Sequence, residues 1–216
     1  MSLRRCPMFP LGSPLLPGAV LPLHVFELRY RMMMDDVVHT DPAEFGVVLI
    51  ERGHEVGGGD VRSMVGTAAH VARHDELEDG RRAVIAVGVR RIRIEQWLPD
   101  DPYPVALVSE WPDDPVEGGV GDERVATERL RGAVDRFLAV VRRLDERTPE
   151  VDPRSDVESL DDYSYRVAIT LPLGAADRQR VLESSDAIER SSRVTTAVED
   201  LEALVRFRLG LGDSPG

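Results

Sequence analysis

The residues able to carry out chemistry are restricted in this sequence, because its 216 residues include arginine but no lysine. A P-loop, a Schiff-base enzyme and a serine–lysine dyad each require a lysine, so these chemistries are excluded. The formal net charge of −12 also argues against a nucleic-acid partner, since phosphate binding depends on a basic surface. Any activity must therefore come from other side chains.

The histidines offer one spacing that is typical of metal ligands. His70 and His74 lie four residues apart, which would place both rings on one face of a helix. Residues 65–72, however, have the apolar pattern of a strand, in which residues four apart are separated by about 13 Å. No His-Glu-x-x-His motif surrounds them. We therefore expect neither a metal site nor a cofactor.

The remaining candidates for catalysis are also weak. Cys6 is the only cysteine, and it lies in an apolar segment with no neighbouring histidine to lower its pKa. The run Gly57–Gly59 lacks the Gly-x-Gly-x-x-Gly spacing of a dinucleotide site. No Gly-x-Ser-x-Gly motif occurs. The sequence predicts no catalytic residue.

The densest basic cluster consists of Arg90, Arg91 and Arg93. In a nucleic-acid interface these side chains would follow the phosphates. The alternative, which we favour, places Arg91 and Arg93 on the water-exposed face of a strand, opposite acidic residues.

The candidate binding residues are four polar side chains that interrupt an apolar segment: His24, Glu27, Arg29 and Arg31. They could form an ion-paired helix start, with Glu27 bonded to Arg31 one turn later, or an edge that contacts a ligand or partner. The adjacent run Met32–Met34 could form a soft peptide-binding surface, but packing of a short helix against strands is favoured.

The elements that position these residues differ between the two halves of the chain. In the first half, alternating apolar residues predict strands, and one helix interrupts them. In the second half, apolar residues recur at helical spacing, as at Leu130, Val134 and Phe137. An Asp-x-x-Glu signal at Asp186 predicts the start of the last helix. The expected strands are 47–51, 65–72, 82–98 and 105–111, and the expected helices are 27–39, 130–144, 157–169, 175–183 and a last one after residue 186.

These patterns define the expected domain organisation. Residues 1–111 should form a β subdomain with one helix, and residues 123–216 a helical subdomain. Between them, residues 112–122 are rich in proline, glycine and acidic side chains, which is typical of a linker.

The opening motif resembles a known family. It reads Met-Phe-Pro-Leu-Gly at 8–12, Leu-Leu-Pro-Gly at 15–18 and Leu-Pro-Leu-His-Val-Phe-Glu at 21–27, and it closes with Arg-Tyr-Arg at 29–31. This run is similar to the start of the amino-terminal, substrate-binding domain of ATP-dependent Lon proteases, a domain that also occurs alone in bacteria. Matching segments continue to about residue 208. Leu16 replaces a usual aromatic residue and Leu28 a usual proline.

The resemblance implies an α+β fold, with a small PUA-like β-barrel followed by a C-terminal helical bundle. It implies a non-catalytic module, not an enzyme, because the ATPase and protease parts of Lon both depend on lysine. The expected partner is an unfolded or apolar polypeptide segment or another protein. The main alternative is a small-molecule sensor, and RNA binding is disfavoured by the charge.

The expected location is the cytoplasm. The lone cysteine cannot form an intrachain disulfide. The apolar segment 8–23 contains four prolines, which would break a signal-peptide or membrane helix. We therefore expect no membrane partner, whereas self-association is left open.

Overall fold

The chain divides into two compact units, Met1–Pro112 and Asp113–Gly216. The structure is a computed structural model, which describes residues 3–52, 61–116, 120–143 and 159–210. One helix begins at Val120, inside the segment 112–122 that was expected to be a linker. Asp122 and Glu123 lie in its first turn, where negative charge is favourable at a helix N-terminus.

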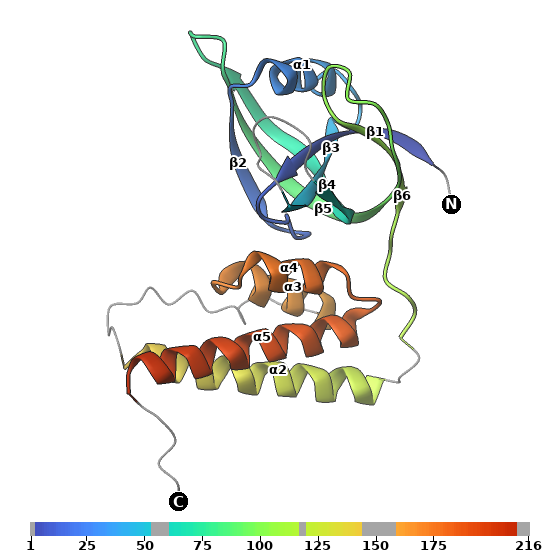
Figure 1. Ribbon diagram of the computed structural model, residues 1–216. Coiled ribbons are helices and arrows are strands. Elements are labelled where there is room, and N and C mark those ends of the chain that lie inside the picture. Colours follow the sequence, from blue (N-terminus) through green and yellow to red (C-terminus); the bar gives the residue numbers. More distant parts are fainter. Residues whose placement is uncertain (1–2, 53–60, 117–119, 144–158, 211–216) are drawn as a thin grey trace, which may run out of the picture. The chain divides into compact units, whose positions relative to one another are not determined.

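The first unit contains one mixed sheet and a helix, so that the whole chain is of the α+β class (Figure 1). The strand order is β2-β5-β4-β3-β1-β6. The strands are β1 (Arg4–Leu11), β2 (Val20–Val25), β3 (Glu44–Arg52), β4 (Val61–Glu76), β5 (Arg82–Trp97) and β6 (Val105–Glu110).

The length of β5 closes the strand pairings into a ring. The second half of β5 pairs with β6, and β6 also pairs with β1. Since β1 pairs with β3 and β3 with β4, the order β5-β4-β3-β1-β6 returns to β5. The first half of β5 pairs with β2, which lies outside this ring.

All five ring strands contribute side chains to one buried cluster, which therefore lies where these strands face one another. Its members are all buried apolar residues, which pack closely against one another. They are Cys6, Met8, Val48, Ala68, Ile92, Ile94, Ala106 and Val108.

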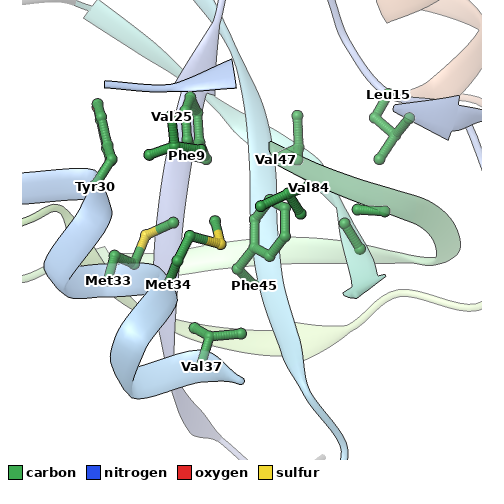
Figure 2. Close-up of a cluster of buried hydrophobic side chains, with 12 residues drawn as sticks. Phe9, Leu15, Val25, Tyr30, Met33, Met34, Val37, Phe45, Val47 and Val84 are labelled. Atoms are coloured by element: carbon green, nitrogen blue, oxygen red, sulfur yellow. The ribbon is translucent and has the colours of Figure 1, made fainter. Parts of the chain in front are cut away.

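A second cluster joins the ring to the helix α1 (Leu28–Val37). Tyr30 stacks on Phe9 of β1, with ring centroids 4.3 Å apart, and Met33, Met34 and Val37 are buried beside it (Figure 2). The helix is one residue shorter at its start than expected and ends before residue 39. Of the run Met32–Met34, Met33 and Met34 therefore pack against the strands, as favoured from the sequence.

The proline-rich opening motif forms β1, a connection that is buried at residues 14–16, and β2. Thr67 of β4 donates its hydroxyl hydrogen to the Leu15 carbonyl over 2.6 Å, which fixes the connection against the sheet. Gly88 is required at the same place, because a Cβ there would lie 2.4 Å from the Leu16 carbonyl oxygen.

The second unit consists of helices in the described residues (Figure 1). The expected apolar stripe is buried at Leu130, Val134 and Phe137 and half-buried at Val141, whereas Leu144 lies outside the described residues. The helix expected over residues 157–169 is observed from residue 160, and residue 157 likewise lies outside the described residues. The helices are α2 (Val120–Val141), α3 (Leu160–Thr170), α4 (Ala175–Leu182) and α5 (Ala187–Arg208).

The start of α5 has the expected cap. Asp186 accepts a hydrogen bond of 2.8 Å from the Glu189 N–H, and the Glu189 carboxylate accepts one of 2.6 Å from the Ser185 N–H. The next residue, Arg190, is fully buried, and it donates to Asp113 at 2.9 Å and to Ser164 at 3.1 Å. This arginine fastens the first residue of the unit to α5.

In the part of the chain that the structure describes, no helix has both the length and the apolar character needed to cross a membrane.

Candidate functional site

The four predicted binding residues follow one another from the end of β2 into the first turn of α1. His24 is exposed near the end of β2, opposite Ala83 of β5. Glu27 is the N-cap of α1 and has an extended backbone, which is the usual geometry of that position. Arg29 and Arg31 lie in the first turn of α1 and are partly buried.

The structure brings together Glu27 and Arg29, not Glu27 and Arg31. Arg29 Nε donates to Glu27 Oε2 over 3.1 Å, and its guanidinium lies 4.5 Å from the centre of the Tyr30 ring. Arg31 reaches Glu27 only through its backbone N–H, which donates to the Glu27 carbonyl at 3.0 Å. The expected pairing was wrong because a residue at the cap has an extended backbone, so helical i, i+4 spacing does not apply to its side chain.

Arg31 is directed toward the turn between β4 and β5. A Cβ on Gly80 in that turn would lie 2.8 Å from Arg31 Nη2, and Gly80 has a φ of +76°. A side chain at position 80 would thus both strain the backbone and displace Arg31. The Arg31 guanidinium therefore packs against this turn rather than beside the Glu27 carboxylate.

Three exposed apolar residues lie next to the Glu27–Arg29 ion pair along the chain. Phe26, Leu28 and Met32 are 60%, 67% and 43% exposed. Leu28 and Met32 lie four residues apart on one face of α1, and Phe26 precedes the helix. We call these three residues the apolar rim. Single exposed apolar residues are common, but three around one ion pair form a surface suited to an apolar partner.

A small pocket lies next to α1, between this helix and strands β4 and β5. Its volume is about 250 Å³. Arg82 lines it and is paired with Asp35 at 2.8 Å and with Glu76 at 2.5 Å, and the hydrogen bond that it donates to Glu76 is the largest cause that raises the pKa of the guanidinium. The lining residues are Met34, Asp35, Val38, His39, His74, Glu76, Arg82 and Val84.

This pocket offers little for a ligand to bind. Its volume is below the roughly 300–1,000 Å³ of usual ligand sites, and its guanidinium is already paired with two carboxylates. Although His74 lines it, His70 does not, and across the described residues no cluster of three potential metal ligands occurs.

The basic cluster on β5 forms internal contacts. Arg90 makes a bidentate pair with the buried Glu44, with bonds of 2.7 and 2.6 Å, and this hydrogen bonding lowers the pKa of the carboxyl. The guanidiniums of Arg91 and Arg93 lie 4.4 and 4.5 Å from the centre of the Trp111 ring.

Arg91 is only 4% exposed, so its expected place on the water-exposed face was wrong. Since Ile92 and Ile94 belong to the ring cluster, Arg91 does lie on the other face of β5, but the Trp111 ring packs on its guanidinium there and covers it. Its guanidinium is therefore not available to a phosphate backbone.

Cys6 lies in the ring cluster, and burial raises the pKa of its thiol to about 11. A thiol that remains protonated at neutral pH is a poor nucleophile. The structure thus makes the one cysteine a packing residue.

Comparisons with known proteins extend over nearly the whole chain. The family model described as the ATP-dependent protease La (LON) substrate-binding domain matches residues 5–200. The chain is 29% identical over 198 residues to Lon protease 2 of Herpetosiphon aurantiacus, and 27% identical over 197 residues to the Lon protease of Escherichia coli K12. Each match covers 89% of this chain but only 23% and 24% of those relatives.

Two solved structures have a similar fold. The Lon N-terminal domain protein from Xanthomonas campestris superposes with a TM-score of 0.63 at 29% identity, covering 89% of this chain and 98% of that one. The N-terminal domain of the Mycobacterium avium complex Lon protease gives 0.67 at 18% identity, covering 91% and 99%.

Proposed function

The chain belongs to the LON substrate-binding domain family, and from this we propose that it is a non-catalytic module that binds unfolded or apolar polypeptide segments. The observation that carries the proposal is the apolar rim, where Phe26, Leu28 and Met32 are exposed beside a single ion pair. An apolar segment that covers these side chains removes them from water, which favours binding at about 25 cal/mol per Å².

The residues around the rim have distinct roles in this proposal. Glu27 and Arg29 form a polar border that an incoming backbone can bond to, and His24 extends the border along β2. Arg31 contributes indirectly, because its guanidinium packs against the turn at Gly80.

We interpret the ring of five strands as the PUA-like barrel of this family and the second unit as its helical bundle. Both would serve as a scaffold. The arginines at 90, 91 and 93 contact Glu44 or Trp111, which supports a polypeptide rather than a nucleic acid as partner.

The proposal is tested by fluorescence anisotropy with labelled, reduced and carboxymethylated α-lactalbumin, a permanently unfolded chain. Phe26→Ser should raise Kd by about tenfold, which corresponds to about 1.4 kcal/mol, because Phe26 is already partly buried and can gain only part of the roughly 3 kcal/mol of full burial. The matched control is Phe207→Ser, which removes a phenylalanine that is 83% exposed on α5. Absence of saturable binding, or an equal effect of both substitutions, contradicts the proposal.

A further inference from the structure

Strand β2 has an open edge. In the described residues it pairs with β5 alone, and it lies at the end of the strand order (Figure 1). An open edge is a template on which another extended chain can pair.

The hydrogen bonds at the start of β2 show which backbone groups face this edge. Gly88 of β5 donates its N–H to the Ala19 carbonyl at 2.9 Å. In an antiparallel pair, every second residue exchanges backbone hydrogen bonds with the partner strand. The next residues of β2 that are bonded to β5 are therefore Leu21, Leu23 and Val25. The backbone groups of the alternate residues, Val20, Pro22 and His24, therefore face the open edge.

The edge carries only one of the usual protections against pairing, a proline at position 22. Natural edge strands carry charged side chains, bulges or prolines. From Cys6 to Phe26 the sequence has no aspartate, glutamate, lysine or arginine, although 31% of the whole chain is charged. Pro22 removes a single N–H, whereas Val20 and His24 each keep a donor and an acceptor. The edge can thus still pair on both sides of Pro22.

The side chains along this edge indicate the chemistry of a partner. Val20 is 64% exposed, and Ile85, which lies opposite Pro22 on β5, is 41% exposed. Beyond Val25 the chain leads directly to Phe26 of the apolar rim. An uncharged edge flanked by apolar side chains is complementary to an uncharged, apolar partner, because a charged one would lose hydration without gaining an ion pair.

We propose that an extended, uncharged polypeptide segment binds by adding as an antiparallel strand to β2, exchanging backbone hydrogen bonds with Val20 and His24. This deepens the proposed function and rests on it: the rim supplies apolar contact, and the edge recognises an extended main chain through its backbone hydrogen bonds. Selection of extended backbone suits a module for unfolded chains, since folded proteins have few unpaired backbone groups to offer.

The direct test is amide hydrogen exchange measured by NMR on the unmodified protein, with and without a short synthetic peptide of alternating valine and threonine. In the free protein the amides of Val20 and His24 should exchange rapidly, and those of Leu21 and Leu23 slowly. The peptide should slow exchange at Val20 and His24 by about tenfold or more at saturation. If it binds with those two rates unchanged, the edge inference is overturned while the proposed function stands.

A pair of variants separates backbone from side chain. His24→Pro removes an open-edge N–H at the position equivalent to Pro22, and it should raise the Kd of the peptide about tenfold. His24→Ala removes the imidazole, which the proposed function places in the polar border, but keeps that N–H, so it should weaken binding clearly less than His24→Pro does. If both substitutions weaken peptide binding equally, the effect comes from the loss of the imidazole, and the inference is overturned. If His24→Pro does not fold by circular dichroism, the exchange measurement decides alone.

The two proposals fail in different ways. If neither the peptide nor unfolded α-lactalbumin binds, the proposed function fails, and the edge inference fails with it. If α-lactalbumin binding requires Phe26 but no exchange changes on β2, only the edge inference is lost.

Discussion

At the scale of single residues, this protein uses its arginines to connect elements. Arg82 joins β5 to α1 and to the end of β4 through Asp35 and Glu76. Arg90 joins β5 to β3 through Glu44. Of the four predicted binding residues, only Glu27 and Arg29 form an ion pair with each other, at the margin of the apolar rim.

Replacement of Glu27 by glutamine tests whether this ion pair serves binding. Partly exposed ion pairs contribute about 1 kcal/mol or less to folding, so the free energy of unfolding in urea should change little. Binding of unfolded α-lactalbumin should weaken several-fold, because the substitution breaks the ion pair that fixes the Arg29 guanidinium at the border of the rim. The control is Glu128→Gln, which breaks the exposed pair with Arg124 on α2 and should leave binding intact. A large loss of stability with unchanged binding would make Glu27 a purely structural residue.

At the scale of elements, α5 is stabilised at its start by an acidic side chain. Hydrogen bonds from the Ser185 backbone and hydroxyl lower the pKa of Glu189 below its ordinary 4.5. A carboxyl whose pKa is lower in the folded state stabilises the fold fully above its unfolded pKa. That contribution is lost as the pH falls through the folded pKa.

We therefore expect Glu189→Gln to destabilise the protein at pH 7 by about 1 kcal/mol, the usual value of a capping interaction. The difference from the unmodified protein should shrink as the pH is lowered below about 4.5. Urea unfolding at a series of pH values measures both. The control, Glu123→Gln in the first turn of α2, should show a smaller difference at pH 7. A difference that grows toward acid contradicts the assignment.

At the scale of the whole molecule, we predict that the purified chain hydrolyses neither ATP nor protein. Hydrolysis by the Lon mechanism depends on a lysine near the phosphates and on another that activates serine, and the sequence has none. Casein incubated with the protein, with and without ATP and Mg²⁺, should remain intact, and no phosphate should be released. A full-length Lon protease is the positive control. Turnover that persists through further purification steps contradicts the prediction.

The sequence by itself determined the features that depend on neighbours along the chain. Alternation across residues 82–98 predicted β5, and the stripe from Leu130 to Phe137 predicted α2. The Asp186–Glu189 signal located the start of α5 within one residue. The opening motif identified the family, because its spacing of prolines, glycines and apolar residues is specific. It also contained the candidate site, from His24 to Arg31.

Tertiary structure alone decided what depends on residues distant in sequence. The parallel pairing of β1 with β3 and the double pairing of β5 have no local signal, because backbone hydrogen bonding accepts any partner strand. The burial of Arg91 follows from the Trp111 ring that covers it, a contact that alternation along β5 cannot predict. The open edge of β2 is likewise a property of the sheet: a strand has a free side only where the fold places no other strand beside it.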